Sequence, residues 1–130
     1  MDILILGGGG FVGHYLYNAL NKDFRVERTY ATHPLPGAFH LDLREQALTA
    51  VIDRPYDIVI NNINPLHFSY RETAASAEAI AEYCRQHGAW LINISSVSAH
   101  DRNRHNDSYS LKKHIVDEIV VQELDGSHTI

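Results

Sequence analysis

Short apolar runs alternate with helical patterns along most of the chain, and this alternation sets its expected architecture. Short runs predict five strands, at residues 2–6, 25–30, 38–41, 57–61 and 89–94; most are apolar, and 25–30 is a mixed run of polar and apolar residues. Helical spacing and an alanine-rich stretch predict helices at residues 12–22 and 70–86, from Asp42 onward, and from Ser108 to Gly126. Strands that alternate with helices favour an α/β domain with a doubly wound parallel sheet.

A glycine-rich turn follows the first predicted strand. The apolar run Ile3–Leu6 leads into Gly7-x-x-Gly10-x-x-Gly13, and helical spacing begins directly afterwards. Such a turn exposes backbone N–H groups at the positive end of a helix, where a phosphate can bind. The strand before it and the helix after it are the context that a dinucleotide-binding motif requires. The alternative is a glycine-rich turn that binds nothing. With dinucleotide binding, we expect a Rossmann-like sheet with strand order 3-2-1-4-5.

Composition and charge narrow the function classes. A chain of 130 residues with 45% hydrophobic and 21% charged residues predicts one globular domain over residues 1–130. A net charge of −5 argues against nonspecific nucleic-acid binding, and no apolar stretch is long enough to cross a bilayer. The start of the chain has no signal-peptide pattern, so we expect a cytoplasmic protein. Cys84 is interpreted as a core residue, and His100 and His105 have no ligand-like spacing, so no metal site is expected.

Two charged residues bear on which dinucleotide would bind. A carboxylate at the end of the second strand holds the ribose of NAD, whereas a basic residue there accommodates the 2′-phosphate of NADP. The chain has Arg28 at this place and no carboxylate after Glu27, which favours NADP slightly over NAD unless Arg28 is a solvated strand residue. Asp42 is interpreted as a helix N-cap with Glu45 as its capping-box partner, and a position near the adenine ring is the alternative.

Polar residues follow the fourth and fifth predicted strands. Asn61 and Asn62 end the apolar run 57–61, and Ser95-Ser96 ends the run 89–94. Ligands of open α/β sheets bind outside the carboxyl ends of the strands. We therefore expect at least one asparagine of this turn to reach the site, although asparagines are also common turn residues.

A tyrosine and a lysine four residues apart supply candidate chemistry. Tyr109 and Lys113 point the same way from the last predicted helix. A tyrosine hydroxyl can give or take a proton, and a nearby ammonium favours its phenolate form. With a serine to hold the reacting oxygen, these groups suit hydride transfer between nicotinamide and a carbonyl or alcohol. The alternative is a pair that decorates a surface helix, and the glycine turn favours catalysis.

Taken together, these motifs resemble the short-chain dehydrogenase/reductase superfamily in order and spacing, over essentially the whole chain. Its extended branch, with the nucleotide-sugar epimerases, dehydratases and dTDP-4-dehydrorhamnose reductases, is the most similar. The resemblance rests on Gly7-x-x-Gly10-Phe11-Val12-Gly13, Arg28-Thr29-Tyr30, Leu41-Asp42-Leu43, the Asn61 region, residues 88–96 and Tyr109-x-x-x-Lys113.

The resemblance implies roles for individual residues. It places the pyrophosphate of the cofactor on Gly7, Gly10, Phe11, Val12 and Gly13. It makes Tyr109 the acid/base, Lys113 the residue that grips the nicotinamide ribose, and Ser96 the catalytic serine. The implied activity is that of an oxidoreductase or epimerase/dehydratase on a small molecule such as a nucleotide sugar.

The chain also departs from the family pattern. The interval from Ser96 to Tyr109 is shorter than in the extended branch, and Thr73 stands where the family often has asparagine. Family members continue with a sixth strand and a substrate lobe, whereas this sequence stops as 128–130 begin a strand. We therefore expect a domain truncated before the sixth strand. The fifth strand would be an exposed sheet edge, which fits a fragment or a homo-oligomer. A non-catalytic NADP(H) sensor or an inactive truncated product is the alternative function.

Overall fold

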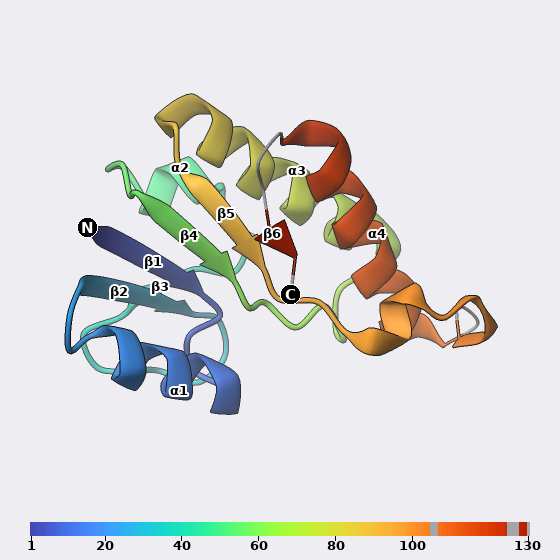
Figure 1. Ribbon diagram of the computed structural model, residues 1–130, viewed down its shortest axis with the longest axis horizontal. Helices are drawn as coiled ribbons and strands as arrows, with labels where there is room; N and C mark the ends of the chain where they lie inside the picture. The colour runs from blue at the N-terminus through green and yellow to red at the C-terminus, as the bar shows by residue number, and fades with distance from the viewer. Residues whose placement is uncertain (105–106, 125–127, 130) are drawn as a thin grey trace.

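A six-stranded parallel sheet forms the centre of the molecule (Figure 1). The computed structural model describes residues 1–104, 107–124 and 128–129. The strands are β1 (Asp2–Leu6), β2 (Arg25–Tyr30), β3 (Phe39–His40), β4 (Ile58–Asn61), β5 (Trp90–Asn93) and β6 (His128–Thr129). Their spatial order is β3-β2-β1-β4-β5-β6 and every neighbouring pair is parallel. The predicted order 3-2-1-4-5 is confirmed for the first five strands.

The short strand β6 changes one expectation about the sheet. Its residues His128 and Thr129 pair with Ile92 and Asn93 of β5, so the predicted edge strand has a neighbour over half its length. The parallel pairing follows from the return of the chain after the last helix to the same end of the sheet.

Helices cover the two faces of the sheet unequally. The helices are α1 (Phe11–Leu20), α2 (Leu48–Val51), α3 (Tyr70–His87) and α4 (Ser108–Glu123), and two short 3-10 turns, η1 (Val97–His100) and η2 (Arg102–Arg104), precede α4. Leu4, Leu6, Val59 and Leu91 pack on the side of α2, α3 and α4. Because side chains alternate along a strand, Ile3, Ile5 and Ile60 face the other side, where α1 packs.

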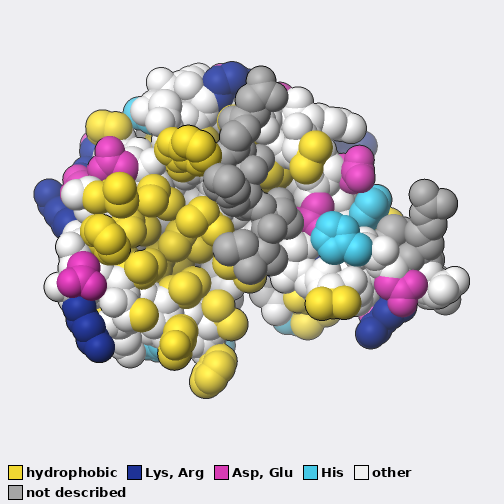
Figure 2. All heavy atoms as spheres, viewed as in Figure 1, with side chains coloured by type: hydrophobic (Ala, Val, Ile, Leu, Met, Phe, Trp, Pro, Cys, Tyr) yellow, Lys and Arg dark blue, Asp and Glu magenta, His cyan; other side chains and the backbone are white. Residues whose placement is uncertain are grey.

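The α1 side of β4 and β5 keeps part of its apolar surface exposed. Ile58, Ile92 and Ile94 are half-buried beside this second core, and Trp90 is exposed. Figure 2 shows hydrophobic side chains gathered over the strands on the face in view. Within the part of the chain that is described, no helix is long and apolar enough to cross a membrane.

The chain near Asp42 differs from the prediction of a helix that begins there. Asp42 and Gln46 enclose a single turn, and α2 begins only at Leu48 with Ala47 as its N-cap. The Asp42 carboxylate accepts hydrogen bonds from the backbone and guanidinium of Arg44. Gln46, and not Glu45, returns its side chain to the Asp42 N–H at 2.7 Å. The N-cap prediction for Asp42 was therefore wrong, because its carboxylate closes this single turn through a local pair with Arg44 and the chain leaves the helical path before α2 begins.

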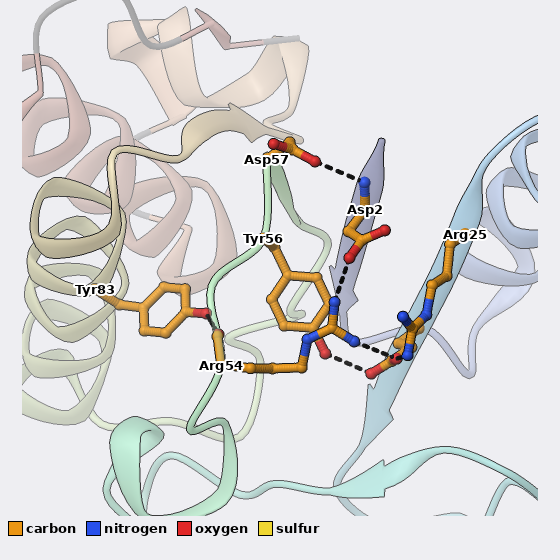
Figure 3. A network of polar contacts seen from close by, with 7 residues as sticks. Asp2, Arg25, Arg54, Tyr56, Asp57 and Tyr83 are labelled. Carbon is orange, nitrogen blue, oxygen red and sulfur yellow. Dashed lines mark hydrogen bonds and ion pairs between the residues drawn. The ribbon is translucent and has the colours of Figure 1, made fainter.

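A polar network joins several elements at the amino ends of the strands (Figure 3). The Arg54 guanidinium pairs with Asp2 of β1 and with Glu27 of β2. Tyr56 donates to Glu27 at 2.5 Å, and Tyr83 of α3 donates to the Arg54 carbonyl. These contacts join two strands, the loop before β4 and a helix at the amino ends of the strands, so the carboxyl ends are left free to build a site.

Candidate functional site

A cavity of about 580 Å³ opens at the carboxyl ends of β1, β2, β4 and β5. The glycine turn lines one end, and Tyr109 and Lys113 of α4 line another part of the wall. The segments after β2, β3 and β4 complete the lining. This is the position at which ligands of open α/β sheets bind. Residues that lie far apart in the sequence therefore meet at one ligand-sized space.

The glycine turn contains several glycines that have no room for a side chain, and at two of them the backbone itself is in the way. Gly7 has φ +73°, and a Cβ there would lie 2.8 Å from the Asn62 carbonyl oxygen. A Cβ on Gly13 would lie 2.7 Å from the Gly8 carbonyl carbon. Gly10, in contrast, lines the cavity and a Cβ there would meet nothing within 4 Å. Gly7 and Gly13 thus shape the turn, and the surface at Gly10 is open toward the cavity.

The start of α1 is suited to an anion. Gly10 is its N-cap and supplies no capping side chain, so the first N–H groups of the helix have no acceptor within the helix. Phe11 and Val12 line the cavity and are exposed, Phe11 by 89%. Backbone donors and a positive helix end, which suit an anion such as a phosphate, therefore lie beside two exposed apolar side chains.

The end of β2 contributes polar groups but no free carboxylate among the described lining residues. Thr29 fixes the glycine turn, since its Oγ1 accepts from Gly7 N–H at 3.1 Å. Arg28 lies outside the cavity lining, with its guanidinium over the Tyr17 ring and 3.1 Å from His14 Nδ1. Asp42 lines the cavity, and its hydrogen bonds to Arg44 lower the pKa of its carboxyl.

The two predicted asparagines have different places. Asn62 lines the cavity and donates from Nδ2 to the Gly7 carbonyl at 3.1 Å, which holds the glycine turn against the end of β4. Asn61 is buried outside the lining, where it donates to Asn93 Oδ1 at 2.9 Å and accepts from the Ile63 N–H. Gly13 is likewise buried beneath the turn and not part of the lining.

Tyr109 and Lys113 both face the cavity, as their spacing predicts. Asp107 caps α4 by accepting from the Tyr109 N–H, and this sets where the helix begins. The Lys113 ammonium donates to the Ile94 carbonyl at 2.9 Å and is 7% exposed. Burial lowers the pKa of Lys113, and the nearby charge of Asp117 raises it in part.

The serine that lines the cavity is Ser95. Its hydroxyl donates to Asp117 at 2.5 Å. Ser96 is half-buried outside the lining, and its Oγ accepts from the Ser98 N–H at the start of η1 and lies 3.0 Å from Ser98 Oγ. The resemblance implied the catalytic role for Ser96, whereas the serine that shares the cavity lining with Lys113 is Ser95.

A buried polar face of α4 was missed from the sequence. The sequence predicts an apolar stripe of Leu111, Ile115, Ile119 and Val120 on this helix. Val120 is buried in the core and the other three are half-buried, while Lys113 and Asp117 are also buried. Asp117 was detectable as the next position at the four-residue spacing of Tyr109 and Lys113. Gly126, expected to end this helix, and His105 and Ile130 lie outside the described residues.

Comparisons with known proteins establish the fold. No family model matches the chain, and no match was found among curated proteins. Among solved structures, vestitone reductase from alfalfa is similar over 99% of this chain and 55% of its own, with 20% identity and a TM-score of 0.75. A short-chain dehydrogenase/reductase superfamily protein from Agrobacterium tumefaciens, solved with bound NAD, is similar over 100% of this chain and 48% of its own, with 19% identity and a TM-score of 0.79.

A third solved structure is similar in the same way. The dTDP-glucose 4,6-dehydratase from Bacillus anthracis, in complex with NAD, covers 95% of this chain at 18% identity, with a TM-score of 0.71. The chain spans about half the length of each of these three proteins. The chain therefore has the Rossmann fold seen in members of the short-chain dehydrogenase/reductase superfamily.

Proposed function

We propose that the chain is the NAD(P)-binding domain of a short-chain-type oxidoreductase or epimerase/dehydratase. The observation that carries the proposal is one cavity with a glycine turn at one end and the pair Tyr109–Lys113 in its wall. A phosphate site alone would serve many proteins. A phosphate site joined to a tyrosine and a buried lysine serves hydride transfer.

The lining residues fit a nicotinamide dinucleotide. The open surface at Gly10 and the start of α1 would hold the diphosphate, beside Phe11 and Val12. Asn62, Asp42 and Arg44 also line the cavity, and they would be available to contact the adenosine. Because the volume of about 580 Å³ is that of a ligand pocket, no rearrangement of the sheet is needed.

The cofactor and the residues of the chain would supply different parts of the reaction. When bound, the nicotinamide would exchange a hydride with a carbonyl or alcohol carbon of the substrate. Tyr109 would give the proton to the new alcohol oxygen or take it from the alcohol. Lys113 would hold a ribose hydroxyl and favour the ionised tyrosine. Ser96 remains our proposal for the serine that holds the reacting oxygen, with Ser95 nearer to Lys113 along the cavity wall.

We propose NADP as the slightly favoured cofactor over NAD. No unpaired carboxylate lines the cavity among the described residues after β2, so nothing there repels a 2′-phosphate. The Arg28 side chain starts beside Gly8, where a Cβ would lie 2.6 Å from the Arg28 Cβ, and its guanidinium would turn from the Tyr17 ring to reach a 2′-phosphate. Asn61 and Gly13 would act from beneath the lining, by holding the turn in place.

We further propose a small-molecule substrate, with a nucleotide sugar as the most plausible one. This rests on the proposed function and on the similarity to a dTDP-glucose 4,6-dehydratase. The residues that select a substrate would belong to a separate lobe outside residues 1–130, or to a second copy that pairs along the edge of the sheet beside β5, where β6 covers only Ile92 and Asn93.

Calorimetric titration with NADPH and then NADH, with the solution mass measured alongside, tests the proposal. We expect micromolar binding, tighter for NADPH, and a mass that shows whether a homo-oligomer forms. Tyr109→Phe is expected to bind equally well and to lower any turnover with nucleotide sugars by at least about 100-fold. No binding of either nucleotide by the folded chain contradicts the proposal. Binding with equal turnover in wild type and Tyr109→Phe would favour a cofactor-binding module without this mechanism.

A further inference from the structure

Asp117 is a buried carboxylate that the proposed reaction does not use. It is 5% exposed and stands four residues after Lys113 on the same face of α4. Its Oδ1 accepts from Asn93 Nδ2 at 2.8 Å, and its Oδ2 accepts from the Ser95 hydroxyl. Asn93 in turn accepts from Asn61. One carboxylate thus joins α4 to the carboxyl ends of β4 and β5, at the wall of the cavity.

A purely structural role would explain why Asp117, Asn93 and Ser95 are hydrogen-bonded to one another. It would not explain why this cluster lies at the cavity wall. Burying a carboxylate lowers the stability of the fold unless the carboxylate is paired and hydrogen-bonded. Neutral groups could join the same elements with a smaller desolvation penalty. Here the carboxylate contacts Ser95, which lines the cavity, and lies one helical turn from Lys113, which also lines it. The contact with Ser95 and the helical spacing from Lys113 both place Asp117 beside the candidate active site.

The hydrogen bond to Asp117 determines whether the Ser95 hydroxyl can donate or accept toward the cavity. A serine has one O–H donor, and Asp117 takes it, so only the lone pairs of Ser95 are left for other partners. Ser95 can then accept a hydrogen bond from a ligand hydroxyl in the cavity but cannot donate one. In the proposed function that ligand group is a hydroxyl of the cofactor ribose.

We propose that Asp117 is a positioning residue of this site: its ionised carboxylate holds Ser95 as a hydrogen-bond acceptor toward the cavity and keeps Lys113 charged. The groups that face Asp117 are Asn93 and Ser95 at the end of β5, His100 of η1 at 3.5 Å, and Lys113 and His114 of its own helix. Its pKa is raised by burial, and these neighbours offset the rise. The part that concerns the ribose rests on the proposed function.

Lysine NMR tests the link to Lys113 without any cofactor. Lys22, Lys112 and Lys113 are the only lysines, so ¹³Cε labelling gives three signals that Lys→Arg variants assign. We expect Asp117→Asn to lower the pKa of Lys113, because a neutral amide no longer favours the ammonium. Glu118→Gln is the matched control, since it removes the same charge from the neighbouring exposed position and should leave Lys113 unchanged. Equal titration of Lys113 in wild type and Asp117→Asn overturns the proposal.

The wild-type chain gives a second measurement in case Asp117→Asn does not fold. The Lys113 signal should show an additional inflection at acid pH, where Asp117 takes up a proton, and the signal of Lys22 should not. A single alkaline inflection of Lys113 overturns the link between the two charges.

NADPH affinity tests the link to Ser95. Ser95→Ala and Asp117→Asn are each expected to weaken NADPH binding about tenfold, with little further loss in the double variant because the two act as a unit. Affinity equal to wild type in Ser95→Ala overturns this part of the proposal. If the wild-type chain binds no NADPH, the proposed function fails, and the lysine titration still decides whether Asp117 controls Lys113.

Discussion

Gly10 and Gly13 belong to the same turn but meet different surroundings, and this separates binding from folding. A side chain at Gly13 would overlap the backbone of Gly8, whereas one at Gly10 would enter the open cavity. We expect Gly10→Ala to unfold at nearly the wild-type urea concentration but to lose most of its NADPH affinity, because the methyl group takes the space of the diphosphate. Gly13→Ala should lower the urea midpoint itself.

The comparison of the two variants carries the inference. Urea unfolding measures the stability of each variant and calorimetry measures its NADPH affinity, on the same preparations. If Gly10→Ala binds NADPH like the wild type, the diphosphate does not lie on the glycine turn. If Gly13→Ala keeps full stability, the close approach of Gly13 to Gly8 does not shape the turn.

At the residue scale, the sequence predicts contacts within one motif better than contacts between motifs. Tyr109 and Lys113 line the cavity because helical spacing alone places them on one face. Asp117 was missed because the rule that apolar residues mark the buried face selected Leu111 and Ile115 instead. Here α4 buries the apolar Val116 and Val120 in the core, and it also buries the polar Lys113 and Asp117. The polar pair meets polar groups at the end of β5, and no local pattern shows that an element will face such groups.

Helix α3 begins with a capping box that explains its position. Ser69 Oγ accepts from the Glu72 N–H at 3.0 Å, and Glu72 returns its carboxylate to the Ser69 N–H at 2.8 Å. We expect Ser69→Ala to lower the free energy of unfolding by about 1 kcal/mol, measured by urea denaturation. Ser108→Ala is the control, because Ser108 also starts a helix but the cap there is Asp107. Equal losses in both variants would show that the capping geometry contributes nothing specific.

At the element scale, the strands were the predictable part. β1 and β2 have the predicted bounds. The apolar run of β1 ends at the glycine turn, and β2 contains the strand-forming residues Val26, Thr29 and Tyr30. The helix expected from Asp42 failed because its start depends on Arg44 and Gln46, whose side chains take the turn instead. The spacing of Ser69 and Glu72 was a readable signal for the start of α3.

The whole molecule separates stabilising contacts from the site. The Arg54 network lies at the amino ends of the strands, and the cavity lies at their carboxyl ends. The parallel sheet makes this division possible, because every strand contributes one end to each function. The sequence predicts the carboxyl-end site from its motifs, but the pairing of Arg54 with Asp2 and Glu27 depends on strand order and has no local signature.

Buried acidic side chains near this network predict how the stability of the molecule depends on alkaline pH. Burial raises the pKa of the Cys84 thiol from 9.0 to about 12, and that of the Tyr83 hydroxyl from 10.0 to about 12. Tyr56 is shifted in the same direction by burial and by its hydrogen bond to Glu27. The folded state therefore keeps protons that the unfolded state releases. The stabilisation is fully present below pH 9 and is lost as the pH rises toward 12.

Cys84→Ala isolates the share of the thiol in this pH dependence. Lys113 acts in the opposite sense, since burial lowers its pKa, but its contribution is the same in both proteins and cancels in their difference. In urea denaturation at pH 8, 9, 10 and 11, we expect the wild-type free energy of unfolding to fall more steeply than that of Cys84→Ala. The slopes should differ by up to about 1.4 kcal/mol per pH unit above pH 9. Tyr15→Phe, which changes an exposed tyrosine, should follow the wild-type slope. Parallel curves for wild type and Cys84→Ala would mean that the thiol ionises as readily in the folded chain as in the unfolded one, and that this part of the core admits water.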